Sequence, residues 1–376
     1  MAISRTCHRP AINAALASVS ALCNADLLRQ FANIASYQGE FDQITAIQAI
    51  RSACDVPGSR TDAKALLYIL CLTRNAQASD PRDRIFSLLG LTRSVPPDEF
   101  KPDYILSVEE VCKLTLLHLF KVMQNLRPLL RWHQKTLDLP LWVPDSTASQ
   151  SHVAPVPLIT QDRCTKVAHA AAGRQSALQY QVDASCRRLH LNGVIFDVVN
   201  RRSDKLFKID EDRLQPYKDL ELAAHDLRQH LDRQEPLWHI VTAGQVDDFY
   251  APRPRFRKGI YPRLCRMNCT TKSSYRWQRT FGKCRSIMEG RSVFVSRTGF
   301  IGVGPNYETR AYNIIGAIVA IIYGSEVPFL LEKHGTWHKL IGECYASGIM
   351  KGEFMELCSK YKGQPGCPEE QVFELR

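Results

Sequence analysis

RSVFVSRTGFIGVGP (residues 291–305) is the stretch that decides the fold of the C-terminal part of the chain. Its aromatic and β-branched residues fall into two short runs on either side of Gly299, as in two strands joined by a tight turn. Three more strand-like runs follow: IVAIIYG (318–324), VPFLLE (327–332) and HKLIGECY (338–345). Gly324, Gly335 and Gly348 punctuate them. The pattern predicts a small antiparallel sheet or barrel of short hairpins.

Strand character extends upstream of this stretch. Apolar residues alternate over 178–182 and again over 189–198, and Asp183 to Ser185 suit the turn between the two runs. A helical insert is expected later, where one apolar stripe (Leu220, Ala224, Leu227, Leu231) runs through a charged segment.

Helical spacing dominates the first part of the chain. Apolar residues recur at intervals of three and four over residues 10–75. Ser79-Asp80-Pro81 is typical of a helix start, and Gly90 suits its end. Ser107 is expected to cap another helix that reaches Val122. The fold class predicted is α+β, with a mainly helical N-terminal half followed by a C-terminal module of short antiparallel strands.

The composition divides the chain into four predicted regions. Residues 1–140 form a helical domain, and 141–176 form a linker rich in Pro, Ser and Thr. Residues 177–360 form a mixed domain with strands, the helical insert and the C-terminal strands. Residues 361–376 are left as a tail.

Bulk composition indicates a globular protein. The 376 residues are 45% hydrophobic and 23% charged, and the 13 cysteines follow no disulfide spacing. The longest apolar run, Ile314 to Gly324, is shorter than the roughly 20 residues that a membrane span needs. We therefore predict reduced thiols, a cytoplasmic location and no membrane contact, with an N-terminal targeting peptide around Arg5 and Arg9 as the alternative.

Positive charge is concentrated in one segment. The formal net charge is +11, and residues 251–300 hold 13 Lys and Arg against one acid, Glu289. Aromatic residues interleave with these cations, which is how single-stranded nucleic acids are held. An acidic partner, or a solvated linker anchored by its aromatic residues, explains the same pattern.

A search for catalytic chemistry is largely negative. The chain has no GxSxG, HExxH, GxxxxGK or CxxC motif, and Gly302 to Pro305 is interpreted as a strand-end turn. Weak candidates remain for zinc at Cys265, Cys269 and Cys284, for a metal at His334, His338 and Cys344, and for acid–base work at Asp210, Glu211 and Asp212. Blander structural roles fit all three groups better. The prediction is therefore no catalytic, cofactor-binding or metal-binding residue, no cofactor and no enzymatic activity.

Five strings in a fixed order carry a family resemblance. They are ASDPRDRIFSLLGL (78–91), KPDYILSVEEVC (101–112), PLWVPDST (140–147), RSVFVSRTGFIGVGP (291–305) and SEVPFLLEKHGTWHKLIGECYASGIMKGE (325–353). Together they resemble the region downstream of the HET domain in fungal heterokaryon-incompatibility proteins, over roughly residues 60 to 355. None of their residues is an obvious nucleophile or general base, so we expect them to hold the fold.

The resemblance also carries departures. The HET domain, which is TIR-like and implicated in triggering incompatibility cell death, normally lies N-terminal to these strings. Its usual motifs have no match here, so the resemblance implies a chain truncated relative to the family. Ser146 and Thr147 stand where the family usually has a Trp. The stretch 311–317 is apolar where the family has a Gly-Asp turn, which is compatible with a retained intron.

The functional prediction combines these points. The chain is expected to be a HET-like protein that takes part in fungal heterokaryon incompatibility or non-self recognition through contacts with other proteins, full-length HET-domain proteins among them. One alternative is binding of nucleic acid or an acidic partner through residues 251–300. Another is an accessory protein of a secondary-metabolite gene cluster.

Overall fold

A computed structural model describes part of the chain. The described residues are 78–89, 100–130, 137–145, 169–173, 177–183, 185–202, 290–305, 314–365 and 367–376, with isolated positions at 66, 67, 69, 70, 73, 240, 243, 244, 287 and 288. The chain divides into two compact units, 1–60 and 61–376, and all described residues belong to the second. Most of the predicted 10–75 helices, the 220–231 stripe and residues 251–286 lie outside this part.

The described helices are short. They are α5 (Asp83–Leu89), α6 (Val108–Met123), the 3-10 helix η2 (Arg127–Leu130) and α11 (Glu353–Lys360). Ser107 caps α6 as predicted: its side chain accepts from the Glu110 amide, and the Glu110 carboxylate accepts from the Ser107 amide. This reciprocal pair satisfies two amides that a helix start otherwise leaves without partners.

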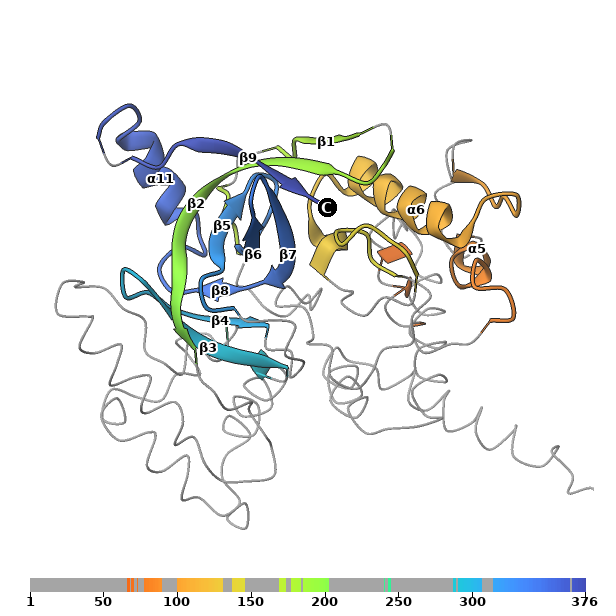
Figure 1. The fold of residues 1–376 in the computed structure, drawn as a ribbon, viewed down its shortest axis with the longest axis horizontal. Coiled ribbons are helices and arrows are strands. Elements are labelled where there is room, and N and C mark those ends of the chain that lie inside the picture. Colours follow the sequence, from red (N-terminus) through yellow and green to blue (C-terminus); the bar gives the residue numbers. More distant parts are fainter. Residues whose placement is uncertain are drawn as a thin grey trace, which may run out of the picture. The chain divides into compact units, whose positions relative to one another are not determined.

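Nine strands form the rest of the described fold (Figure 1). They are β1 (Tyr180–Val182), β2 (Leu189–Arg202), β3 (Arg291–Ser296), β4 (Ile301–Pro305), β5 (Ile318–Ile322), β6 (Phe329–His334), β7 (Trp337–Glu343), β8 (Tyr345–Ala346) and β9 (Glu370–Leu375). The predicted turn before β2 is confirmed, because the Asp183 carboxylate accepts from the amides of Arg187 and Arg188.

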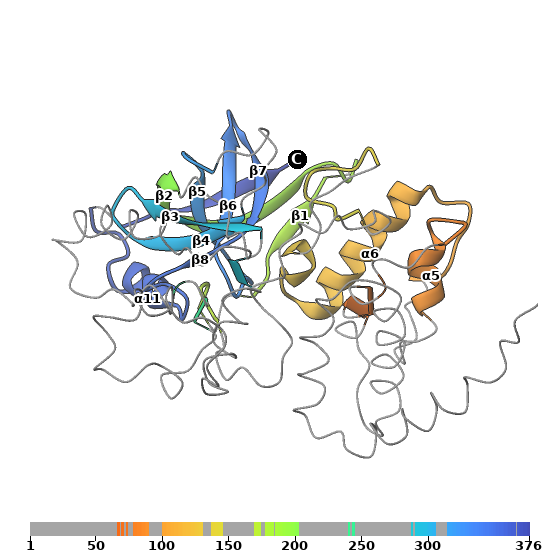
Figure 2. The ribbon, with the colours of Figure 1, turned by 90° about the horizontal axis from the view of Figure 1, so that it is seen from below.

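The strand pairings close the sheet on itself. In the order β5-β6-β7-β9-β2-β3-β4-β8, the first five strands form a closed ring because β2 also pairs with β5. β3 and β4 continue the sheet from β2, and β8 pairs with β4. Because Cys344 alone separates β8 from the end of β7, the chain itself joins β8 to β7. A second circuit therefore runs through β2, β3, β4, β8, β7, β6 and β5. Figure 2 shows the β3–β4 hairpin lying crosswise to β6 and β7.

The main hydrophobic core is built from nearly every strand of this second circuit. Its buried members are Val199, Phe294, Ile314, Ala317, Val319, Leu330, Ile341 and Cys344. β4 contributes glycines instead of side chains: a Cβ on Gly304 would lie 2.6 Å from Leu330 Cδ1, and one on Gly302 would lie 2.5 Å from the Tyr345 carbonyl oxygen. The two glycines leave the space that the Phe294 ring and Leu330 fill.

The predicted fold class is wrong in both halves. Among the described residues of the N-terminal half, the helices are the 7-residue α5, the 16-residue α6 and η2, with isolated helical positions at 66, 67, 69 and 70; residues 101–107 and 137–145 are not helical. The sheet is not a set of short antiparallel hairpins, because β2 is 14 residues long and β7 pairs with β9 in parallel. Two register shifts in β2 bend it between partners, and such bulges interrupt the alternation by which a long strand is recognised.

The 314–317 stretch is fully integrated into the fold. It makes a turn in which the Ala317 amide donates to the Ile314 carbonyl, and Gly316 adopts a φ of +85°. Gly316 also donates to the Val199 carbonyl, and both Ile314 and Ala317 are buried in the core. Of the apolar residues that depart from the family pattern, Ile314 and Ala317 therefore serve as core residues, whereas Ile315 is exposed.

Crowding at β4 gives a first prediction. Gly302→Ala should lower the free energy of unfolding by about 3 kcal/mol, because its new methyl group meets backbone that cannot move without breaking strand pairing. Gly335→Ala is the control, since a Cβ added there would meet nothing within 4 Å. Only the φ of +61° opposes this substitution, which should lower the free energy of unfolding by about 1 kcal/mol. Urea unfolding of both variants measures the difference, and equal losses would contradict this account of β4.

Candidate functional site

The ASDPRDR string forms a polar cluster at the start of α5. Arg82 binds the Asp80 carboxylate with both Nε (3.0 Å) and Nη2 (2.7 Å). Its Nη1 donates to the carbonyl oxygens of Tyr104 (2.7 Å) and Leu106 (2.9 Å). One guanidinium thus ties the helix start to the segment that precedes α6, 22 to 24 residues later.

Tyr104, in the turn that precedes α6, completes the cluster. Its hydroxyl donates to Asp83, its ring meets Phe86 edge-on at 5.2 Å, and the Arg82 guanidinium lies 5.3 Å from the ring centre. The hydrogen bond to Asp83, followed by burial, raises the pKa of Tyr104, and hydrogen bonds from Arg82 lower the pKa of Asp80. We call Asp80, Arg82, Asp83 and Tyr104 the latch.

The latch fixes an exposed apolar pair. Ile105 is 94% exposed and Tyr104 is 53% exposed, although their backbone is held by Arg82 and by the Asp103 side chain, which accepts from the Ile105 amide at 2.8 Å. A single exposed apolar residue is ordinary. Tyr104 and Ile105 are two adjacent ones, on a loop held by hydrogen bonds.

A second charged pair joins the two C-terminal strings of the resemblance. Arg291 begins RSVFVS and Glu343 lies in GECY; both are almost fully buried, and Arg291 Nη2 lies 2.7 Å from Glu343 Oε1. Arg291 Nη1 also donates to the Ile287 carbonyl at 2.9 Å. Arg291, one of the cations of the basic stretch, is therefore buried and paired within the protein.

The PLWVPD string docks onto strands. The buried Trp142 donates from Nε1 to the Arg187 carbonyl at 3.1 Å, and the Leu141 amide donates to the Arg376 carbonyl at 3.0 Å. Nearby, Arg127 of η2 grips Glu326 with two hydrogen bonds of 2.9 and 2.7 Å. These contacts hold the helices of this unit to its sheet.

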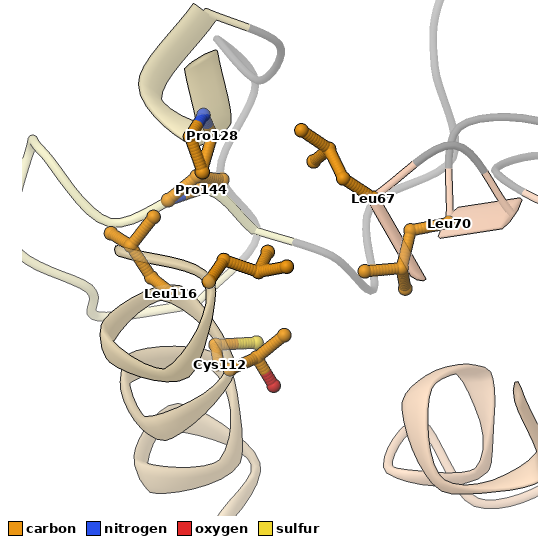
Figure 3. Close-up of a pocket in the computed structure, with 8 residues that line it drawn as sticks. Leu67, Leu70, Cys112, Leu116, Pro128 and Pro144 are labelled. Atoms are coloured by element: carbon orange, nitrogen blue, oxygen red, sulfur yellow. The ribbon is translucent and has the colours of Figure 1, made fainter. Parts of the chain in front are cut away.

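A small apolar pocket lies within the helical part (Figure 3). Leu67 and Leu70 face Cys112 and Leu116 of α6, with further lining from Thr115, Leu119, Pro128 and Pro144. The Thr115 hydroxyl already donates to the Val111 carbonyl, at 2.7 Å. The lining therefore offers mainly packing surface.

The histidine and cysteine candidates have different surroundings. His334 is half-exposed at the end of β6 and stacks on Trp337 at 4.5 Å. His338 is buried in β7 against Phe373, and burial lowers its pKa. Cys344 lies in the core, where burial raises its thiol pKa well above the ordinary value. Gly302 to Pro305, interpreted as a strand-end turn, instead lies within β4 and pairs with β3.

The other candidates lie elsewhere. Cys265, Cys269 and Cys284, and the carboxylates Asp210, Glu211 and Asp212, fall outside the described residues. Among residues that are described, no three His, Cys, Asp or Glu side chains gather as a metal site would require. The described helices also include none with the length and apolarity needed to cross a bilayer. The latch residues, which were expected from the sequence only to hold the fold, also form an exposed polar cluster.

The buried pair generates a stability prediction. Arg291→Met leaves the Glu343 carboxylate buried without its cation and should cost about 3–5 kcal/mol, and Glu343→Leu added to it should recover part of this loss. The matched control is Arg187→Met, which breaks the exposed pair with Asp138 and should cost less than about 1 kcal/mol. Denaturant unfolding measures all three, and a double variant no more stable than Arg291→Met would refute the charge argument.

The latch generates a prediction about local order. Arg82→Lys keeps the charge but loses the fork that spans Asp80 and two carbonyls, so amides of residues 103–106 should exchange hydrogen faster. Lys113→Arg, on α6 outside the latch, should leave this exchange unchanged. Hydrogen-exchange mass spectrometry at neutral pH tests this, and protection that survives Arg82→Lys would show that Arg82 does not hold the loop.

Comparison with known proteins adds one positive result. No curated protein and no solved structure matches the chain. One family model matches residues 266–362. These residues contain β3 to β8 and α11, whereas β1, β2 and β9 lie outside them. The model that residues 266–362 match is that of the Het-6 beta-barrel domain, a domain of fungal HET-domain family proteins. This match confirms the resemblance for its two C-terminal strings, at 291–305 and 325–353, and is consistent with a HET-related protein.

Proposed function

We propose that this protein acts in fungal heterokaryon incompatibility or non-self recognition by contacting other proteins, with full-length HET-domain proteins as its partners. The observation that carries the proposal is the latch, which presents Tyr104 and Ile105 on a fixed loop. The match of residues 266–362 to a domain of HET-family proteins supports the biological setting.

The proposal assigns the protein a non-enzymatic role. Strings of the resemblance supply contacts that stabilise the fold: the latch, the Trp142 anchor and the Arg291–Glu343 pair. Their polar groups bind one another and the backbone. A protein surface held in this way suits recognition, since an ordered loop loses little conformational entropy on binding.

The alternatives have less support in the structure. Nucleic-acid binding through residues 251–300 depends largely on residues outside the described part, and Arg291 is buried against Glu343. The accessory-protein alternative rested on the cysteine and histidine candidates, of which His334, His338 and Cys344 have different surroundings. Contact with proteins of the HET family is therefore the function we favour.

The experiment is co-expression in a fungal host. The chain is expressed alone and with full-length HET-domain proteins, and cell death or its suppression is scored. We expect an effect in at least one pairing. Ile105→Ser should abolish it, since losing such an apolar anchor weakens binding about tenfold or more.

Val122→Ser is the matched control, because Val122 is 45% exposed on α6 and takes no part in the latch. It should leave the effect intact. No effect in any pairing, or equal loss with both substitutions, would count against the proposal.

A further inference from the structure

Two cysteines meet where α11 turns into β9. Cys358 lies in the last turns of α11, and Cys367 precedes β9. The Cys367 sulfur lies 3.5 Å from the Cys358 carbonyl oxygen, to which its thiol donates. Both are partly exposed, so solvent reagents can reach them.

The connection between them is compact enough to keep the sulfurs together. The Tyr361 amide donates to Leu357, Gln364 to Tyr361, and Cys367 to Gln364, each at 3.0 to 3.1 Å. Gly363 adopts a φ of +80° within this run. These successive turns reverse the chain and return Cys367 to the helix.

We propose that Cys358 and Cys367 form a reversible disulfide, a modification site that clasps α11 to the start of β9. The oxidant class is a peroxide. One thiol loses its proton, and the resulting thiolate attacks hydrogen peroxide and breaks the O–O bond. The sulfur becomes a sulfenic acid, and the hydroxide that leaves takes up the thiol's proton as water; the proton of the second thiol is taken up in the same way in the next step. The second thiolate attacks that sulfur, the S–O bond breaks, and a second water leaves. The pair loses two electrons, which the peroxide gains.

The surroundings favour this pair over the other described cysteines. Cys112 and Cys344 are 1% and 0% exposed, and burial raises the pKa of Cys344 far from the thiolate range. Burial, followed by the interaction with Cys367, also raises the pKa of Cys358. Cys186 is partly exposed, but it lies in the β1–β2 turn away from this pair.

The clasp has a structural consequence. α11 has no fully buried residue, and it is held by Phe354 and Met355 packing at the edge of a core cluster. β9 pairs with β2 over six residues and reaches β7 at His338 (Figure 1). A covalent link between α11 and the approach to β9 would restrict fraying of both elements.

The test uses the purified full chain. After hydrogen peroxide treatment and alkylation of remaining thiols, peptide mass spectrometry should find a Cys358–Cys367 link that dithiothreitol reverses. Amides of residues 353–373 should exchange hydrogen more slowly once the link forms. Cys186→Ser should form the link like the wild type, and Cys367→Ser should not form it.

Two outcomes would overturn the proposal. One is that Cys358 and Cys367 both stay alkylatable after peroxide oxidises other thiols. The other is that they couple mainly to other cysteines or between chains. Because these readouts are made on wild-type protein, they do not depend on how well the serine variants fold.

Discussion

The pairing of β2 is the constraint on which the described structure depends. This single strand pairs with β1 and β9 along its first half, with β5 across its middle and with β3 at its end. Gly193 permits the close approach, because a Cβ there would lie 2.9 Å from the Ile322 Cα. Two register shifts, between Ile195 and Asp197 and between Val199 and Arg201, bend β2 as it passes from β5 to β3, and its partners enclose Phe294 and Val319 in the core.

Charge is used in two different ways around this sheet. The Arg291–Glu343 pair lies in a dry environment, where each charge is costly without the other, so it fixes which strands meet. The Asp80–Arg82 pair is partly exposed, and its electrostatic energy is screened by water. Its value is geometric, because a planar guanidinium with several donors can hold two distant segments at set positions.

That difference separates stability from recognition. Buried contacts such as Arg291 with Glu343 and Trp142 with the Arg187 carbonyl serve the fold and offer nothing to a partner. The latch serves the fold too, but it leaves Ile105 in water. The proposed contact surface and the proposed thiol clasp lie on different elements, so each can be tested without disturbing the other.

The sequence by itself determined the local features. The hairpin at 291–305, the Ser107 cap and the Asp183 turn follow from residues only a few positions apart, whose preferences act through neighbouring backbone groups. It also carried the family resemblance, through strings whose order can be recognised without a structure.

Tertiary structure alone decided what those strings do. Arg82 meets carbonyls 22 and 24 residues away, and Arg291 meets a carboxylate 52 residues away. The length of β2 and the parallel pairing of β7 with β9 depend on strands that are distant in the sequence, which a local residue pattern does not identify. The predicted fold class was wrong because residue spacing reports only which residues prefer one face, whereas strand length, register and bulges are set by the surfaces that pack against a segment.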